Sequence, residues 1–260
     1  MKNILITGSS KRIGAEFVKF FYKNNFNIAL HYNKSKKQAI KLSKLLRYKK
    51  SRVVIVKGDL SSEKGAKKIF SESKKKLGKI THLINCASVF ENDDIKNFNS
   101  SKWNMNINVN LKAPFILMSE FSKQKFNKKD QGNIINVIDQ RVFNLTPFFF
   151  SYTLSKVALY NLTITSAMRL APDIRVNCIA PGPVIKNLRQ NEDQFKKQYM
   201  NTLLKTKVNP MELCEAAQFF FNTSSVTGEV ISLDSGQRIC LLYTSPSPRD
   251  VEESRMPSSA

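Results

Sequence analysis

A tyrosine and a lysine four residues apart, Tyr152 and Lys156, are the side chains best suited to chemistry in this 260-residue sequence. They lie in SYTLSKVALYNLT, which is typical of a helix, and four residues make about one turn, so both side chains leave the same face. A phenol has a reference pKa of about 10, and a nearby ammonium lowers that value because it favours the phenolate. The pair is therefore a candidate proton donor, and the acidic Asp139 precedes it closely.

A glycine-rich turn near the N-terminus, in NILITGSSKRIG, is the second feature that indicates a site. Ile4 to Thr7 is predicted to form a buried strand, and Gly8 permits the tight turn that follows it. Gly14 allows close packing of a helix that begins near Arg12, whose free N–H groups would face a pyrophosphate. Ordinary strand–turn–helix units contain such turns too, so the motif indicates nucleotide binding only together with the rest of the chain.

Length and composition limit the classes of protein to consider. A chain of 260 residues fits one large α/β domain, and no apolar run approaches the roughly 20 residues of a membrane span. Met1 leads almost directly into the first strand, so we expect no signal peptide. The four cysteines are scattered, which indicates reduced thiols and no metal site. We therefore expect a cytoplasmic protein with no membrane partner.

The formal net charge of +22 raises the question of nucleic acid as a partner. The lysines, however, are spread over the polar faces of several predicted helices, and no basic motif with interleaved aromatic residues stands out. Abundant Asn, Lys, Ile and Phe are typical of an AT-rich coding sequence. We expect no dedicated nucleic-acid binding, although a positive surface would steer an anionic cofactor or a small anionic substrate.

Strand-like and helix-like segments alternate along the chain, which predicts a mostly parallel sheet with helices on both faces. The predicted strands are Ile4–Thr7, Ile28–Tyr32, Arg52–Lys57, His82–Cys86, Asn133–Ile138, Arg175–Ile179 and Glu229–Leu233. The predicted helices are Arg12–Asn24, Lys36–Tyr48, Glu63–Leu77, Ser101–Asn127, Tyr152–Leu170 and Pro210–Asn222. Seven strands fit a single doubly wound, Rossmann-type α/β domain. A polar segment, Lys186–Lys205, is also predicted to be helical.

From Lys2 to about Ile239 the chain resembles the short-chain dehydrogenase/reductase family, because the family's motifs occur here in the family's order. These motifs are Thr7-Gly8 with Gly14, Asp59-Leu60, Asn85-Cys86-Ala87-Ser88, Asn110 in VNLKAPF, Tyr152 with Lys156, and Pro181-Gly182 after RVNCIA. Within the family, the chain is most similar to the branch of pteridine reductases and dihydromonapterin reductases. Three local matches support that branch: Arg12 in TGSSKRIG, LHYNKS after the second strand, and Asp139 where most relatives carry a catalytic serine.

The segment after the second predicted strand bears on the choice of cofactor. An NAD-binding fold usually has Asp or Glu there to bind the ribose hydroxyls, whereas His31-Tyr32-Asn33-Lys34-Ser35 contains no acid. A cation and a hydroxyl suit a 2′-phosphate, so we expect NADPH. Lys34 could also be one more solvated lysine, so the missing acid is the stronger half of this argument. The resemblance implies that the cofactor contacts Gly8, Ser9, Lys11, Arg12, Ile13, Gly14, His31, Tyr32, Asn33, Lys34, Ser35, Asp59, Leu60, Asn85, Ala87, Ser88, Asn110, Tyr152, Lys156, Pro181, Gly182 and Val184. Asp59 resembles the residue that contacts the adenine, and it could also cap a helix near Ser61.

The resemblance also implies four catalytic residues, which are Asn110, Asp139, Tyr152 and Lys156. Tyr152 would donate a proton as hydride is transferred, and Lys156 would also hold the nicotinamide ribose. Asn110 would support a proton relay through a water; it lies among several asparagines, and the LKAPF that follows makes it the best match.

Asp139 departs from the family pattern, and this bears on the substrate. A carboxylate would repel the negative charge that develops on a ketone oxygen. Beside Tyr152, a carboxyl group could instead protonate or hydrogen-bond to a ring nitrogen, which suits reduction of a C=N bond in a dihydropteridine. Alternatively, Asp139 forms an ion pair with Arg141 or Lys156 in a degenerate site.

The residues expected to bind substrate are Arg12, Phe90 and Asp139. Phe90 matches the aromatic residue that stacks on a pterin in the pteridine reductase branch, and core packing would explain it almost as well. Three functions remain: reduction of a dihydropteridine such as dihydromonapterin, dihydrobiopterin or dihydrofolate; reduction of a ketone or 3-oxoacyl thioester; and nucleotide binding without catalysis. The intact Tyr152 and Lys156 argue against the third function, and Asp139 and Phe90 favour the first over the second.

After Ile239 the composition shifts abruptly to Ser, Pro and Arg in CLLYTSPSPRDVEESRMPSSA. This segment resembles a translated sequencing-adapter read-through, so we expect residues 240–260 to be a non-native, disordered tail after a domain of residues 1–239. Helices such as Ser101–Asn127 and Tyr152–Leu170 commonly form dimers in the family, so we expect a homotetramer or homodimer by analogy.

Overall fold

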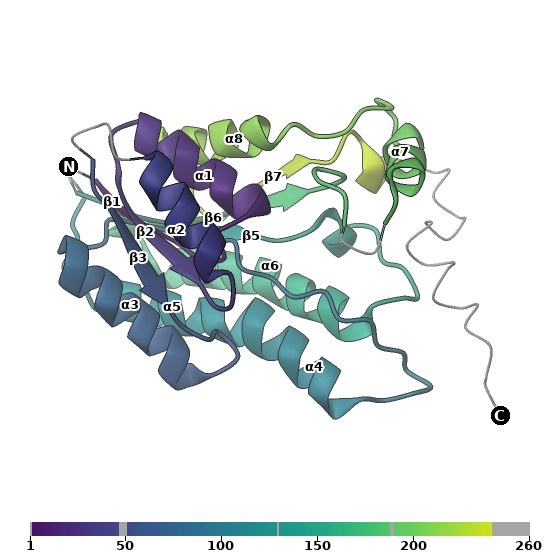
Figure 1. Ribbon diagram of the computed structural model, residues 1–260, viewed down its shortest axis with the longest axis horizontal. Helices are drawn as coiled ribbons and strands as arrows, with labels where there is room; N and C mark the ends of the chain where they lie inside the picture. The colour runs from purple at the N-terminus through teal and green to yellow at the C-terminus, as the bar shows by residue number, and fades with distance from the viewer. Residues whose placement is uncertain (1, 47–50, 129, 188–189, 241–260) are drawn as a thin grey trace.

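The computed structural model describes residues 2–46, 51–128, 130–187 and 190–240, with a seven-stranded parallel sheet at its centre (Figure 1). The strands are β1 (Asn3–Ile6), β2 (Asn27–Tyr32), β3 (Val53–Lys57), β4 (His82–Asn85), β5 (Gly132–Val137), β6 (Ile174–Pro181) and β7 (Val230–Leu233). Their order in the sheet is β3-β2-β1-β4-β5-β6-β7, and all neighbouring strands are parallel. The chain therefore winds outward from the centre in both directions, which confirms the predicted doubly wound fold. Except for Cys240, the predicted tail lies outside the described residues.

Helices cover both faces of the sheet (Figure 1). They are α1 (Arg12–Lys23), α2 (Lys36–Leu45), α3 (Glu63–Leu77), α4 (Ser100–Ile107), α5 (Ala113–Ser122), α6 (Phe150–Leu170), α7 (Glu192–Met200) and α8 (Pro210–Asn222), with short 3-10 turns at Gln140–Val142 and Gln237–Ile239. Helices α1, α2 and α8 lie on one face, and α3, α4, α5 and α6 lie on the other.

Two large apolar cores and a smaller third cluster around Leu159 fill the spaces between the sheet and its helices, and the alternation of side chains along the strands supplies the two large ones. Ile4 and Ile6 of β1 belong to one core, whereas Leu5 belongs to the other. On the first face, Phe17 and Phe21 of α1 are fully buried. Because every strand in the middle of the sheet is covered on both sides, these strands read as nearly continuous apolar runs in the sequence.

The predicted helix Ser101–Asn127 is wrong as a single element, because a π-helical turn at Asn108–Lys112 separates α4 from α5. Pro114 has no N–H to donate to the carbonyl of Asn110, so the regular ladder of hydrogen bonds cannot continue there. The N–H of Ala113 instead bonds to the carbonyl of Asn108, five residues back. Helix α5 then ends at Ser122, and Gln124 turns inward to bond to both backbone groups of Ile80.

Two other predicted helices are shorter than expected. Helix α2 ends at Leu45, and Tyr48 lies outside the described residues. Among the described residues of the segment Lys186–Lys205, which leave out 188–189, only α7 is helical. It begins at a capping box in which Asn191 and Gln194 bond to each other's backbone. Over the described residues, no helix is both long enough and apolar enough to cross a membrane.

Candidate active site

A cleft of about 740 Å³ opens at the carboxyl ends of the central strands, next to the point where the winding direction changes between β1 and β4. This is where open α/β sheets bind their ligands. The predicted site residues that line it are Gly8, Lys11, Arg12, Ile13, Gly14, His31, Tyr32, Asn33, Lys34, Ser35, Asp59, Leu60, Ala87, Ser88, Phe90, Asp139, Tyr152, Lys156, Pro181, Gly182 and Val184. The fold thus brings residues as far apart in the sequence as Gly8 and Val184 together at one edge of the sheet.

The glycine turn at the base of the cleft requires glycine for steric reasons. Gly8 has a φ of +63°, and a Cβ atom there would lie 2.7 Å from the Cα atom of Ala87. A Cβ atom on Gly14 would lie 2.5 Å from the carbonyl oxygen of Gly8. The hydroxyl oxygen of Thr7 accepts hydrogen bonds from the N–H groups of Cys86 and Ala87, both at 3.0 Å. The turn after β1 is therefore fixed directly against the end of β4.

His31 also fixes this turn, and it does so as a neutral ring. Its Nδ1 accepts a hydrogen bond from the N–H of Gly8 at 3.0 Å, and its Nε2 lies 3.1 Å from the carbonyl oxygen of Gly58. This arrangement requires the proton on Nε2, because Nδ1 is the acceptor. Burial lowers the pKa of His31 to about 4, against the opposing effects of Gly58 and Asp59. His31 therefore supports the cofactor turn without adding positive charge to it.

Helices α1 and α2 begin at the nucleotide end of the cleft without side-chain caps, as α5 and α6 also do elsewhere in the fold. Their N-cap residues, Lys11 and Ser35, make no side-chain cap hydrogen bond, and neither helix has an acidic residue in its first turn. By contrast, side chains cap α3, α4, α7 and α8 through Ser62, Asn99, Asn191 and Asn209. Uncapped N–H groups carry partial positive charge and are available to an anion. Two anionic groups of one ligand could therefore be held at this edge of the cleft.

Arg12 connects the glycine turn to the loop after β6. Its φ of +54° is a left-handed conformation that favours glycine, which accounts for glycine at this place in the common family pattern. Its guanidinium donates hydrogen bonds to the carbonyl oxygens of Lys186 at 2.8 Å and Ile185 at 3.1 Å. The predicted contact of Arg12 with a phosphate or a substrate stays a prediction.

Tyr152, Asp139 and Lys156 meet at the other end of the cleft. The Tyr152 hydroxyl donates a hydrogen bond of 2.6 Å to Oδ2 of Asp139. The Lys156 Nζ donates to the carbonyl oxygen of Val137 at 2.9 Å and lies 5.9 Å from the centre of the Tyr152 ring. Burial lowers the pKa of Lys156 to about 8, while the charge of Asp139 opposes that change. The cleft thus holds an acid bonded to a phenol, and an amine with a pKa of about 8 that lies on the same side of the cleft.

The other oxygen of Asp139 has a local structural role. Oδ1 accepts a hydrogen bond of 2.9 Å from the N–H of Arg141, which caps the short turn Gln140–Val142. The guanidinium of Arg141 donates to the hydroxyl of Thr146 at 2.6 Å. Asp139 is therefore held in one orientation, with Oδ2 directed at Tyr152.

Phe90 is both a wall of the cleft and part of an aromatic cluster. Its ring stacks on Phe149, with centroids 4.1 Å apart and an interplanar angle of 25°. It also meets the edge of the Tyr152 ring at 4.5 Å and 83°. Phe90 therefore both lines the cleft and packs against other aromatic rings, and its stacking on a pterin stays a prediction.

Three predicted site residues are not among those that line the cleft. The Asn85 amide donates to Asn136 of β5 at 2.8 Å, which joins two strands. The hydroxyl of Ser9 accepts from the N–H of His31 at 2.9 Å. The amide of Asn110 bonds to both backbone groups of Val89. These three side chains hold the backbone segments that line the cleft and do not line it themselves.

Sequence reasoning missed several residues that line the cleft. They are Ser10, Cys86, Val89, Glu91, Met105, Val109, Val137, Ile138, Ile185 and Asn187. Seven of them (Ser10, Cys86, Val89, Glu91, Val109, Ile138 and Ile185) adjoin predicted residues in the sequence, so a wider margin around each motif would have found them. Met105 and Asn187 carry no such signal.

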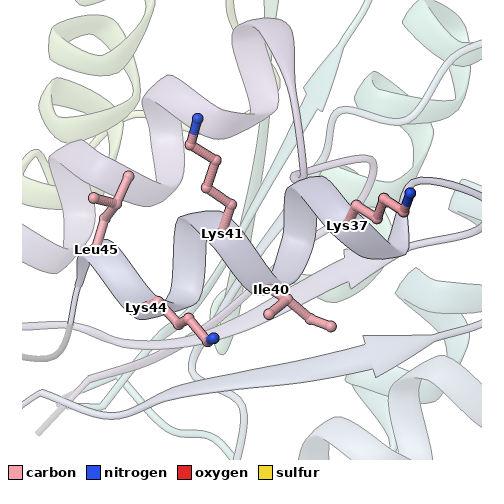
Figure 2. A pocket seen from close by; sticks show the side chains of 5 residues that line it. All are labelled: Lys37, Ile40, Lys41, Lys44 and Leu45. Atoms are coloured by element: carbon pink, nitrogen blue, oxygen red, sulfur yellow. The ribbon is translucent and has the colours of Figure 1, made fainter.

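A second hollow runs along the outside of α2 and is lined by Lys37, Ile40, Lys41, Lys44 and Leu45 (Figure 2). These side chains point in different directions along the helix and do not converge on one point. Three of the five are lysines, and there is no acid or second catalytic group beside them, so this hollow is not a candidate for chemistry. Among the described residues, no group of three His, Cys, Asp or Glu side chains could hold a metal ion.

Comparison with known proteins agrees with this geometry. Residues 2–197 match the family model of the short chain dehydrogenases, so the chain belongs to this family of oxidoreductases. A crystal structure of FolM alternative dihydrofolate reductase 1 from Brucella canis, complexed with NADP, has a TM-score of 0.89 and 33% sequence identity. The match covers 95% of this chain and 97% of that one.

Curated relatives are less similar in sequence and match slightly less of the chain. Glucose 1-dehydrogenase 2 from Bacillus subtilis is 24% identical over 92% of this chain and 95% of its own length. The 3-oxoacyl-[acyl-carrier-protein] reductase FabG from Staphylococcus epidermidis is 23% identical over 90% of this chain and 98% of its own length.

Proposed function

We propose that this protein is an NADPH-dependent reductase that delivers hydride to a C=N bond of a dihydropteridine, with Tyr152 as the proton donor. The observation that carries the proposal is the hydrogen bond of 2.6 Å between the Tyr152 hydroxyl and Asp139 inside the cleft. The similarity to the NADP-bound FolM alternative dihydrofolate reductase, at 33% identity over nearly the whole chain, supports the same substrate class.

The charge of Asp139 distinguishes the two kinds of reduction. Hydride addition to a ketone builds negative charge on oxygen, and a carboxylate beside the proton donor would oppose it. Hydride addition to a C=N bond is helped by positive charge on the nitrogen, which a carboxylate favours. In this mechanism the Tyr152 hydroxyl turns its single proton from Asp139 to the ring nitrogen as hydride adds to the neighbouring carbon, which leaves a phenolate beside Lys156, and the carboxylate of Asp139 favours positive charge on the ring nitrogen during the step.

Lys156 supports the same step from the other side of Tyr152. Its pKa of about 8 leaves the amine mostly charged at neutral pH, and a cation near the phenol favours loss of the phenolic proton. Its bond to the carbonyl of Val137 fixes where that charge lies.

The residues present fit NADPH, which would supply the hydride. The uncapped start of α1 at the glycine turn suits a pyrophosphate, and the uncapped start of α2 suits a 2′-phosphate. Lys34 and Ser35 lie at the second of these places, and no acid stands there to prefer ribose hydroxyls. The carboxylate of Asp59 accepts from Asn33 at 3.1 Å and from the N–H of Ser61 at 3.0 Å, which orders the adenine side of the cleft.

Reduction of a carbonyl group is the second candidate, because the Tyr152–Lys156 pair alone would serve a ketone or a 3-oxoacyl thioester. The relative FabG matches this chain along nearly its whole length. Asp139 beside Tyr152 is the feature that favours the dihydropteridine.

We also propose that the protein forms a homotetramer or homodimer in the cytoplasm. Apolar side chains on the α5 and α6 face support association between copies: Phe115 is 56% exposed and Leu154 is 50% exposed. The four free cysteines support a reducing compartment. Light scattering on the purified protein would give the number of copies.

The experiment that tests the function follows NADPH absorbance with dihydromonapterin, dihydrobiopterin, dihydrofolate, small ketones and a 3-oxoacyl thioester. Wild type should reduce at least one dihydropteridine, and Tyr152→Phe and Asp139→Ser should each lose that activity. Reduction of carbonyls alone, and faster by Asp139→Ser than by wild type, would refute the proposal in favour of the second candidate.

A further inference from the structure

Two buried asparagine amides clamp the segment that carries Phe90. The Oδ1 atom of Asn106 accepts from the N–H of Glu91 at 3.2 Å, and its Nδ2 donates to the carbonyl of Glu91 at 3.0 Å and to the Ser151 hydroxyl at 2.8 Å. Asn110 repeats the pattern with Val89: its Oδ1 accepts at 2.9 Å and its Nδ2 donates at 3.0 Å. Both asparagine side chains are fully buried.

The two amides bind the same segment at two successive places, and each amide with its hydrogen bonds forms one rung between that segment and α6. Asn106 and Asn110 are about one helical turn apart, and their partners Glu91 and Val89 are two residues apart, so both amides face the same segment of chain. The second rung ends on α6 as the first does, because Nδ2 of Asn110 donates to Ser155 at 3.2 Å. Phe90 lies between the two clamped residues.

The rung at Asn106 connects the substrate wall to the proton donor. Its α6 partner, Ser151, directly precedes Tyr152, and the Phe90 ring contacts the Tyr152 ring at 4.5 Å. The same loop is tied to α6 once more, because both carboxylate oxygens of Asp93 accept from the Ser151 N–H at 3.1 Å. Movement of the Phe90 segment relative to Tyr152 would have to break these bonds.

We propose that Asn106 is a positioning residue for the reaction: it holds Phe90 against Tyr152 and so sets where the substrate ring lies relative to the proton donor. Asn106 is not among the residues that line the cleft, so it acts through the Glu91 backbone and Ser151. This role goes beyond the proposed substrate, because it applies to any ring that packs on Phe90.

The chemistry of the rung explains why an amide is needed there. It has to accept one hydrogen bond and donate two, which only Asn or Gln can do with a single planar group. Asn106→Asp keeps the shape but loses both donors and sets a second acceptor against the carbonyl of Glu91. Asn106→Leu keeps the approximate volume and loses all three bonds.

The test compares Asn106→Leu and Asn106→Asp with Asn104→Leu, an exposed asparagine on the same helix. Hydrogen–deuterium exchange of the peptide covering residues 86–95 needs no substrate. It should rise at least tenfold in both Asn106 variants and stay unchanged in Asn104→Leu. Ser151→Ala removes only the hydrogen bond from Asn106 to the Ser151 hydroxyl, so exchange should rise by a smaller factor. This variant keeps the proposal testable if the Asn106 variants fold poorly.

Kinetics separate positioning from a merely structural role. The first probe is dihydrofolate, followed by the best substrate of the panel above. Both Asn106 variants should raise the KM for the substrate and lower kcat, so that kcat/KM falls at least tenfold. The Kd of NADPH, measured by its fluorescence, should stay within twofold of wild type. Equal losses in NADPH and substrate binding, or kinetics no worse than those of Asn104→Leu, would overturn the proposal.

The two proposals fail in different ways. Unchanged exchange at residues 86–95 overturns the role of Asn106 whichever compound is reduced. Reduction of carbonyls alone refutes the dihydropteridine proposal and leaves the role of Asn106 to be decided by the same variants with that carbonyl as probe.

Discussion

Lowering the pH from 7 to 5 perturbs two buried histidines, His31 and His82, and the expected loss of stability can be worked out from the structure. Burial lowers the pKa of His31 from 6.5 to about 4. Burial also lowers the pKa of His82, to about 3, with the charges of Lys2 and Arg175 acting in the same direction. Between pH 6.5 and these values the unfolded chain binds protons that the folded chain does not, so stability falls as the pH falls.

The magnitude follows from the distance between pH 5 and the unfolded pKa. One pH unit corresponds to about 1.4 kcal/mol per group, and pH 5 lies about 1.5 units below the unfolded value, so each histidine contributes about 2 kcal/mol. Both together remove about 4 kcal/mol, a large part of the 5–15 kcal/mol that is typical of domains. The loss from His31 should level off near pH 4 and that from His82 near pH 3.

His82→Phe provides the control. The His82 ring lies 4.4 Å from Phe221 and 5.1 Å from Phe26, and its Nε2 has no hydrogen-bond partner among the described residues. A phenyl ring can pack against the same aromatic rings, although it removes the hydrogen bond of 2.8 Å between Nδ1 and the Thr81 hydroxyl, so each protein is compared with itself at the two pH values. The variant should lose about 2 of the 4 kcal/mol of pH dependence. Urea unfolding at pH 7 and pH 5, followed by circular dichroism at fixed ionic strength, measures it. If wild type and His82→Phe lose the same free energy between the two pH values, the reasoning is wrong.

The remaining predictions concern the cleft. Tyr152→Phe should reduce kcat by about a hundredfold or more while the Kd of NADPH changes little, since general acid catalysis contributes about that much; stopped-flow turnover checks it. Lys34→Glu should weaken NADPH by about tenfold relative to NADH because it places an acid beside the 2′-phosphate, whereas Lys44→Glu at the other end of α2 should not; competitive titration decides. Gly8→Ala should abolish measurable NADPH binding by calorimetry, since the added Cβ would lie 2.7 Å from Ala87 at a φ of +63°.

Elements that depend on local patterns could be predicted from the sequence. The strand at Ile4 and the turn at Gly8 follow from an apolar run and from a conformation that only glycine adopts easily. The Tyr152–Lys156 pair follows from helical spacing, and the structure places both in one cleft. In each case the residues that carry the signal are neighbours in the sequence.

Side chains whose roles depend on distant partners could not be predicted in the same way. His31 supports Gly8, which lies 23 residues away, and Asn106 bonds to Ser151, which lies 45 residues away. Nothing in the sequence around either residue shows which backbone groups the fold will bring to it. The interruption at Asn108–Lys112 could be predicted in part. Pro114 indicates that a backbone donor is missing there, but it does not specify a π turn.

Asp139 shows how one carboxylate can combine a structural and a chemical role, and how the two can be separated. Oδ1 accepts from the N–H of Arg141 and so caps the short turn, and Oδ2 accepts a hydrogen bond from the Tyr152 hydroxyl. Serine caps such turns about as well as aspartate does, so Asp139→Ser should keep the turn while removing the negative charge. A hydroxyl at this place can also donate to Tyr152, which reverses the hydrogen bond seen here. A change of substrate preference in Asp139→Ser, with unfolding unchanged, would therefore report on the charge at Tyr152 and not on the local fold.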